Sequence, residues 1–296
     1  MRRAVSAHQF LDRCTFPPAG TSVVCAVSGG ADSLALLVLA VAAECNVTAV
    51  HVDHGLRAES GQEAGLVASA AARLGAVFRS VRVDIAAGGN VEARARAARR
   101  AALPPQAATG HTADDQAETI LLNLLRGAAL DGLGGMRPGP TKPLLALRRS
   151  ETHALCVAEG FVPVQDPSNA DPAFRRNRVR HELLPLLDAI AERDVVPVIV
   201  RQAGLLRDEA DLLAELSGAI DAAEATAIAA APPALARRAL RALLADGGHP
   251  PSSAAVERVL AVARGEFIAC ELEGGRRVSR SRGRLHTGPA SRRPAE

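Results

Sequence analysis

The chain has 296 residues, which is enough for one or two domains with a sizeable core, and a formal net charge of +3. This small excess excludes a polycation, so any surface for nucleic acid has to be a local patch. The chain has no Trp, no Tyr and six Phe, which argues against a site that binds RNA mainly by aromatic stacking.

The five cysteines are scattered and form no C-x-x-C pair, which argues against a zinc ribbon, an iron–sulfur site or a dithiol relay. Their odd number also fits a reducing compartment. No long apolar segment follows the first residues, as it would in a signal peptide, and the longest apolar run, 34–43, is too short to span a bilayer. We therefore expect a cytoplasmic protein.

The most informative stretch lies near the N-terminus. An apolar run over 23–27 predicts a buried strand, the sequence Ser-Gly-Gly-Ala-Asp-Ser follows at 28–33, and good helix formers occupy 34–43. The N–H groups of a glycine-rich turn and of a helix N-terminus attract phosphate, but Asp32 would repel it unless a cation such as Mg²⁺ lies between them. The alternative is a structural turn in which Asp32 or Ser33 caps the helix.

Strands and helices are then expected to alternate. The pattern predicts strands over 47–54, 76–83, 107–109 and 142–147, and helices over 60–74, 91–102 and 149–159. This alternation is typical of βαβ units with right-handed crossovers, and it predicts an α/β domain built on a doubly wound parallel sheet of five strands. In such a sheet, ligands bind beyond the carboxyl ends of the strands.

Three polar clusters, at 28–33, 51–57 and 110–118, lie at the ends of the predicted strands 23–27, 47–54 and 107–109. In the second cluster, at 51–57, three side chains are of types that bind metals. Alternation along a strand, however, points His51 and Asp53 to one face and His54 to the other. A position that lines a nucleotide is therefore the better functional interpretation, and an ordinary polar loop is the alternative.

The third cluster is rich in acids and opens a helix. His111, Asp115 and Glu118 are spaced i, i+4, i+7, and Asp114 and Glu118 are spaced i, i+4, which places the acids on one face near the helix N-terminus. Thr112 and Asp115 also form a capping-box-like pair, and first-turn acids suit the helix dipole. Capping needs one or two acids, so the full set indicates a function: holding Mg²⁺, receiving a proton from an amine or binding an ammonium group.

Two later segments allow more than one interpretation. Residues 128–141 are rich in glycine and proline, and the sequence leaves open whether they form a mobile flap or a linker. Four arginines between 175 and 180, at the start of a predicted helix, form a local anion-binding surface, for which a solvated basic face is the alternative. Their position between the α/β region and the helices that follow favours contact with phosphate or RNA.

From about residue 190 the pattern becomes mainly helical. Helices are predicted over 195–229, 232–245 and 252–264. Short β-like pieces follow, and the arginine-rich stretch between them can bind an RNA backbone. We therefore expect a phosphate-binding catalytic domain over 1–188 and a smaller, mainly α-helical domain with a basic β-like tail over 189–296.

Four motifs, in this order, resemble those of the bacterial tRNA(Ile)-lysidine synthases, members of the PP-loop ATP pyrophosphatase superfamily. They are Ser-Gly-Gly-Ala-Asp-Ser at 28–33, His-Val-Asp-His-Gly-Leu-Arg at 51–57, Gly-His-Thr-Ala-Asp-Asp-Gln-Ala-Glu-Thr at 110–119 and Arg-Asn-Arg-Val-Arg at 176–180. The first is shared across the superfamily, and the combination is specific to the synthases. The close match runs from about residue 20 to 187 and implies the adenine nucleotide α-hydrolase-like PP-loop fold for the ATP-binding domain.

The resemblance implies ATP-dependent ligation of free lysine to C2 of the wobble cytidine in a tRNA(Ile) with a CAU anticodon. ATP first adenylates the C2 oxygen and releases pyrophosphate, and the lysine amine then displaces AMP to give lysidine. The implied cofactors are ATP, as a substrate, and Mg²⁺. The implied partners are this tRNA, which the second domain contacts, and free lysine, and the sequence leaves open whether the chain forms a homodimer.

The resemblance and the polar clusters together assign four groups of residues. The catalytic group is Asp32, His111, Asp115, Glu118 and Arg180. The ATP-binding group is Ser28, Gly29, Gly30, Ala31, Asp32, Ser33, His51, Arg57, Gly110 and His111. The metal ligands are Asp32 and Asp115, and the RNA-binding group is Arg175, Arg176, Asn177, Arg276, Arg277 and Arg280.

Two rival functions stay open. One is another PP-loop enzyme that modifies tRNA or forms an amide, although a thiolase needs paired cysteines and a glutamine-dependent synthetase needs an amidotransferase partner. The other is a non-catalytic nucleotide-binding or RNA-binding module, which gains little from the clustered acids. One departure from the family pattern is Lys142, which stands where arginine is expected before Pro-Leu-Leu. This departure matters because lysine and arginine bind phosphate differently.

Overall fold

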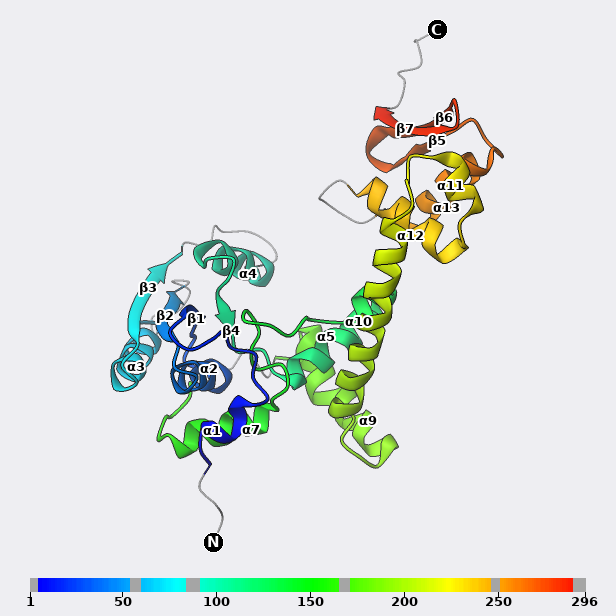
Figure 1. The fold of residues 1–296 in the computed structure, drawn as a ribbon. Helices are drawn as coiled ribbons and strands as arrows, with labels where there is room; N and C mark the ends of the chain where they lie inside the picture. Colours follow the sequence, from blue (N-terminus) through cyan, green and yellow to red (C-terminus); the bar gives the residue numbers. More distant parts are fainter. Residues whose placement is uncertain (1–4, 54–59, 84–90, 165–170, 246–250, 290–296) are drawn as a thin grey trace. The chain divides into compact units, whose positions relative to one another are not determined.

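The computed structural model describes residues 5–53, 60–83, 91–164, 171–245 and 251–289 (Figure 1). The chain forms two compact units, Met1–Leu205 and Leu206–Glu296, and each has a hydrophobic core of its own. The domain boundary expected after residue 188 stays a prediction. None of the described helices is long and apolar enough to cross a membrane.

The first unit is built on a parallel sheet with the strand order β3-β2-β1-β4. The strands are β1 Ser22–Ala26, β2 Asn46–Asp53, β3 Val77–Arg82 and β4 Ala108–Thr109. Cys25 of β1 lies opposite Ala49 of β2 and Ala108 of β4, and all three side chains are fully buried. The predicted parallel α/β architecture is therefore confirmed, with the sheet centre in the core.

The sheet has four strands in the part of the chain that the structure describes, so the fifth strand expected over 142–147 is wrong. Lys142 makes one isolated bridge, and the N–H of Leu147 bonds back to the carbonyl of Leu144, as in a turn. Pro143 has no N–H to contribute to a ladder. Leu144 and Leu147 are nonetheless buried. An apolar run predicts burial, and here the burial occurs in a turn rather than in a strand.

Helices flank the sheet as the periodicity predicts. They are α1 His8–Leu11, α2 Ala31–Ala42, α3 Ser60–Arg73, α4 Val91–Ala102, α5 Ala113–Leu125, α6 Leu130–Leu133 and α7 Arg149–Ala158. Every residue of α2 from Ser33 to Ala40 is buried, because this helix packs against β1, β2 and α7. Figure 1 shows α2 and α3 on one side of the strands and α4 on the other.

The segment 128–141, which contains α6, is held to α5. The side-chain amide of Gln116 makes two hydrogen bonds of 2.8 Å with the backbone of Met136. The amide of Asn123 donates to the carbonyl of Gly132, also at 2.8 Å. The segment is thereby packed on the helix that carries the acidic cluster.

A small apolar cluster joins α5 to the arginine-rich segment. α8 Arg175–Arg178, a π-helical turn Val179–Leu183 and α9 Leu184–Ala191 follow one another directly. Val179 and Leu184 pack with Ala113 and Ala117 of α5. This packing holds the arginines of α8 and the π-helical turn beside the first turns of α5.

The second unit combines helices with a small antiparallel sheet in the order β5-β6-β7. Its elements are the end of α10 Val196–Gly218, then α11 Ala225–Ala230, α12 Pro233–Leu244, α13 Ser253–Arg264, β5 Ala269–Leu272, β6 Arg276–Ser281 and β7 Arg284–Pro289. The helix expected over 195–229 is broken between α10 and α11. The carboxylate of Asp221 accepts from the N–H of Ala223, which favours a turn there over a continuous helix. The expected smaller, mainly helical region with β-like strands at its end is confirmed.

Candidate active site

The glycine-rich turn lies between β1 and α2, as predicted. Gly30 precedes α2 as its N-cap, and Gly29 has a φ of +84°, a left-handed conformation that favours glycine. The hydroxyl of Ser33 accepts from the N–H of Ser28 at 3.1 Å and donates to the carbonyl of Gly30 at 2.8 Å. The turn is thus shaped by its own hydrogen bonds, and the N-terminus of α2 is directed toward it.

His51 is buried near the end of β2 and bonds to the residue that precedes this turn. Its Nδ1 lies 3.0 Å from the carbonyl oxygen of Val27. A carbonyl only accepts, so Nδ1 carries the hydrogen and Nε2 is an acceptor in the neutral ring. His51 therefore ties β2 to the turn. Arg57, the other residue predicted in this cluster to bind ATP, lies outside the described residues.

Gly110 brings the end of β4 against the start of α2. A Cβ at this position would lie 2.5 Å from the carbonyl oxygen and 2.7 Å from the carbonyl carbon of Asp32. Both atoms belong to the backbone and cannot move aside without shifting α2. The position therefore requires glycine for a steric reason, in addition to any contact with a nucleotide.

We expect Gly110→Ala to destabilise the first unit by about 1–3 kcal/mol, the usual cost of forcing extra volume into a packed site. Thermal unfolding measures this change. Gly65→Ala is the matched control, because no heavy atom lies within 4 Å of the added Cβ. Equal melting temperatures for the two variants would contradict the close approach.

His111 is oriented by a short chain of hydrogen bonds. The hydroxyl of Thr109 lies 3.1 Å from the carbonyl of Thr141, to which it donates, and 2.8 Å from Nδ1 of His111. Since the hydroxyl has one hydrogen, it accepts from His111, and Nδ1 carries the proton. In the neutral ring, Nε2 is then the basic nitrogen.

The two oxygens of Asp115 have different functions. Oδ2 accepts from the N–H and the hydroxyl of Thr112 at 2.8 and 3.0 Å, which caps α5 as the sequence suggests. Oδ1 lies 2.9 Å from both Arg149 Nη2 and Arg176 Nη2. The capping and functional interpretations of this acid are therefore compatible.

Three carboxylates and three guanidinium groups meet beside the turn, and we call them the carboxylate–guanidinium cluster. Glu118 is fully buried and pairs with Arg176 at 2.6 Å, Arg180 at 2.7 Å and Arg149 at 3.2 Å. Arg149 also reaches Asp115 at 2.9 Å and Asp32 at 3.4 Å. The members are Asp32, Asp115, Glu118, Arg149, Arg176 and Arg180, whose formal charges cancel.

Burial and neighbouring charges shift the pKa values of Asp32 and Asp115 in opposite directions. Burial raises the pKa of Asp32 above its usual value, and the hydrogen bond from Thr152 and the charge of Arg149 offset only part of that rise. Burial alone would also raise the pKa of Asp115, but Arg149 and Arg176 bring it below the usual range. Asp115 is therefore ionised at neutral pH.

Comparison with known proteins identifies the family of this chain. A model described as a PP-loop domain matches residues 4–187, and one described as a TilS substrate binding domain matches residues 224–286. The tRNA(Ile)-lysidine synthase of Nocardia farcinica is 39% identical over 94% of this chain and 95% of the relative. This chain belongs to the tRNA(Ile)-lysidine synthase family.

Other relatives agree with this assignment. The tRNA(Ile)-lysidine synthase of Thermobifida fusca is 38% identical over 92% of this chain and 91% of the relative. That of Rhodococcus erythropolis is 43% identical over 76% and 74%. The solved structure of the U34-tRNA thiolase NcsA from Methanococcus maripaludis has a TM-score of 0.56 at 19% identity, covers 68% of this chain and 78% of its own, and shows likeness of fold alone.

α7 supplies site residues that the sequence-based prediction missed in this synthase-family chain. Arg149 pairs with all three acids, and the hydroxyl of Thr152 donates to Asp32 at 2.5 Å. Arg148 pairs with Asp114 at 3.0 Å and also with Asp194. A signal was present, because two arginines at a helix N-terminus oppose the preference for acids there.

The arginine-rich segment divides into different environments. Arg176, which was expected to bind RNA, and Arg180, which was expected to be catalytic, both enter the cluster, whereas Arg178 pairs with Glu182 on the surface at 2.8 Å. Asn177 is buried and donates to the carbonyl of Asp171 at 2.9 Å. Arg175 is exposed. The alternation of buried and exposed side chains follows from the packing of one helical face on α5.

Asp32 and Asp115 form the candidate metal site. The residues that the structure describes include no group of three or more His, Cys, Asp or Glu side chains that could hold a metal ion. Mg²⁺, however, is commonly bound by one or two carboxylates together with substrate phosphates and water. Asp32 and Asp115 share the guanidinium of Arg149, so their oxygens face a common point, and this pair fits a metal that arrives with a nucleotide.

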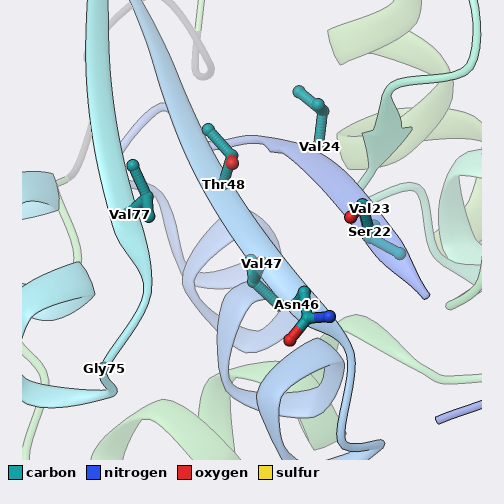
Figure 2. Close-up of a pocket in the computed structure, with 8 residues that line it drawn as sticks. All are labelled: Ser22, Val23, Val24, Asn46, Val47, Thr48, Gly75 and Val77. Atoms are coloured by element: carbon teal, nitrogen blue, oxygen red, sulfur yellow. The ribbon is translucent and has the colours of Figure 1, made fainter. Parts of the chain in front are cut away.

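A pocket at the opposite end of the sheet lies apart from this site. Figure 2 shows it at the amino ends of β1, β2 and β3. It is lined by Ser22, Val23, Val24, Asn46, Val47, Thr48, Gly75 and Val77. Ligands of parallel α/β sheets bind beyond the carboxyl ends, where the glycine-rich turn and the cluster lie, so this pocket is not part of the site.

Proposed function

We propose that the protein ligates free lysine to C2 of the wobble cytidine in a tRNA(Ile) with a CAU anticodon, and converts ATP to AMP and pyrophosphate. The observation that carries this proposal is the meeting of the PP-loop turn with the carboxylate–guanidinium cluster in a chain of this family. Three acids would not help a passive module to bind a negatively charged nucleotide, and burial of one of them costs free energy.

In the first step the C2 oxygen of cytidine attacks the α-phosphate of ATP, an O–P bond forms, and pyrophosphate leaves. The N–H groups of Gly29 and Gly30 and the N-terminus of α2 would hold the phosphates. Asp32 and Asp115 would hold Mg²⁺, which neutralises the charge of the departing pyrophosphate when it is bound. Arg176 and Arg180 would contact the transferred phosphate, because their side chains are about one-quarter exposed.

In the second step the side-chain amine of lysine attacks C2, a C–N bond forms, and AMP leaves. The amine has to lose a proton as it attacks. Nε2 of His111 would accept this proton, because Nδ1 already donates to Thr109. Glu118 is less accessible to the amine, since it is fully buried and paired with three arginines.

The rival thiolase function finds no support in the cysteines. Cys25 and Cys156 are buried, and burial raises the pKa of each thiol to about 12. Such thiols stay protonated near neutral pH and are poor nucleophiles. All five cysteines are free.

Formation of AMP tests this proposal in a simple assay. With ATP alone we expect little AMP, with ATP and a CAU-anticodon tRNA(Ile) we expect adenylation, and with lysine added we expect continuous turnover. AMP formation that is independent of tRNA would point to another PP-loop enzyme. No AMP under any condition would favour the non-catalytic module.

The arginines of β6 support RNA binding unequally. Val278 faces the core, so alternation turns Arg276 toward the same face and Arg277 toward the other. Arg276 donates to the carbonyl of Leu244 at 2.8 Å, at the end of α12. Arg280 lies against Gly265, where a Cβ would be 2.7 Å from its Nη1. Arg277 lies on the face of β6 opposite Val278, and we propose this face as the one that meets an RNA backbone.

We expect Arg277→Ala to weaken tRNA binding and to lower the slope of log affinity against log salt by about 1, as loss of one phosphate contact does. Arg276→Ala should instead lower the stability of the second unit by about 1 kcal/mol, because it removes a hydrogen bond at the end of α12. Filter binding at several salt concentrations and thermal unfolding separate the two effects. The reverse pattern would contradict the placement of β6.

We further propose a cytoplasmic location and leave association to a direct test. Free cysteines fit a reducing compartment, and cell fractionation checks this. A homodimer would bury apolar side chains that are now exposed, such as Leu186 and Ile190 of α9, which are 55% and 72% exposed. Sedimentation of the wild type and of Ile190→Glu measures whether copies associate through this helix.

A further inference from the structure

Arg149 occupies the centre of the carboxylate–guanidinium cluster. Its Nε lies 3.4 Å from Oδ2 of Asp32, its Nη2 lies 2.9 Å from Oδ1 of Asp115, and its Nη1 lies 3.2 Å from Oε1 of Glu118. Within the described ranges, it is the one guanidinium that contacts both Asp32 and Asp115. It therefore occupies the point at which the two candidate metal ligands converge.

The charge balance of the cluster disfavours the presence of both Arg149 and a metal ion between Asp32 and Asp115. Three acids are balanced by three arginines. A divalent cation that bridges Asp32 and Asp115 would take the position between them that the guanidinium of Arg149 fills, whereas Arg176 contacts only Asp115 of the two, and like charges in one partly buried position repel strongly. Entry of the metal therefore requires Arg149 to move away from these two carboxylates.

Arg149 can move without leaving a buried charge unpaired. Asp115 keeps Arg176 at 2.9 Å, and Glu118 keeps Arg176 at 2.6 Å and Arg180 at 2.7 Å. Asp32 keeps the hydroxyl of Thr152 and would gain the metal. The side chain of Arg149 is 28% exposed, so it has access to solvent and to an incoming ligand.

The ATP polyphosphate is the chemical partner that would receive this guanidinium. It carries several negative charges, arrives together with the metal, and presents oxygens that suit the planar fork of arginine. The backbone N–H of Arg149 bonds to Asp114 at 2.7 Å, which anchors the start of α7 while the side chain moves.

We propose that Arg149 is an exchangeable counter-ion: it neutralises Asp32 and Asp115 in the ligand-free protein and transfers to the polyphosphate when ATP and the metal enter. It is a positioning residue for the metal ligands before ATP arrives. The proposal rests on the proposed function in taking ATP as the ligand and Asp32 and Asp115 as the residues that hold the metal.

Binding of Mn²⁺ alone to the ligand-free protein tests this exchange without any turnover. We expect Arg149→Gln to bind Mn²⁺ on the order of tenfold more tightly than the wild type, because a competing positive charge is gone. The same variant should bind metal-free ATP about tenfold more weakly, because it lacks one charge-assisted contact to phosphate. Arg178→Gln, which removes an equal charge from the exposed pair with Glu182, should change neither value.

Arg149→Lys keeps the test decisive if the glutamine variant does not fold. A lysine ammonium has one nitrogen and cannot bridge three carboxylates, so Mn²⁺ should still bind about threefold more tightly than in the wild type. Unchanged or weaker Mn²⁺ binding in the folded variants would overturn the proposal and leave Arg149 a purely structural residue. If the Arg149 variants bind Mn²⁺ as the wild type does while the wild type forms lysidine, the exchange is wrong and the proposed function stands. If the variants bind Mn²⁺ more tightly while the wild type forms no lysidine, the proposed function is wrong and the exchange stands.

Discussion

Glu118→Gln is expected to destabilise the first unit by about 3–5 kcal/mol, the usual cost of removing one partner from a buried ion pair. Glu118 is fully buried and contacts three guanidinium groups at 2.6, 2.7 and 3.2 Å. An amide of the same shape cannot balance their charge, and the remaining acids of the cluster are only Asp32 and Asp115. The arginines are about one-quarter exposed, which favours the lower end of this range.

Denaturant unfolding of Glu118→Gln against Glu182→Gln measures this cost. Glu182 pairs with Arg178 at 2.8 Å with the i, i+4 spacing, but both side chains are more than half exposed. Loss of such a surface pair costs about 0.3–0.5 kcal/mol. Similar midpoints for the two variants would show that the buried cluster is not needed to hold α5, α7 and α8 together.

Asp32→Asn and Asp115→Asn are each expected to lower the rate of adenylation by at least about a hundredfold, because each removes a charged ligand of the proposed metal site. Folding should survive both changes. An amide oxygen at position 115 can still accept from the N–H of Thr112, and one at position 32 can still accept from Thr152. The two effects can therefore be measured on folded protein.

Single-turnover formation of adenylated tRNA is the measurement for these variants, with circular dichroism as the check on folding. Asp208→Asn is the matched control, since Asp208 is an exposed residue of α10. Near-normal adenylation by either cluster variant would remove that residue from the metal site. A large loss in the control would show that the assay responds to net charge rather than to the site.

The sequence predicts those parts of the site that depend on patterns among residues a few positions apart. The turn at 28–33 is bounded by a buried strand and a buried helix, and the acids of α5 repeat on one helical face. Both patterns depend on neighbours a few residues apart, and the structure has the strand, the turn and the helices where they were expected.

Arg149 could not be predicted in this way, because tertiary packing alone brings it to the acids. It is 117 residues from Asp32 and 31 from Glu118 along the chain, and the packing of α7 on α2 closes that distance. The wrong fifth strand has a related cause. Leu144 and Leu147 are buried, as an apolar run indicates, but periodicity cannot distinguish a buried turn from a buried strand.

The basic residues of β6 show the same limit at a smaller scale. A run of arginines predicts positive charge, but the direction of each side chain depends on the register of the sheet. Val278 sets that register by facing the core, and Arg276 then donates to a backbone carbonyl within the unit. The sequence thus predicts the positive charge of this region, and the register of the sheet decides which face of β6 each arginine side chain occupies.

Mass analysis of nucleosides tests the central claim most directly. A tRNA(Ile) with a CAU anticodon is incubated with the protein, ATP and lysine, and is then digested to nucleosides. We predict that the wobble cytidine is converted to its condensation product with one lysine, and that omission of either ATP or lysine prevents this. An unchanged cytidine in the complete reaction, or the same product in a tRNA without the CAU anticodon, would contradict the proposed function.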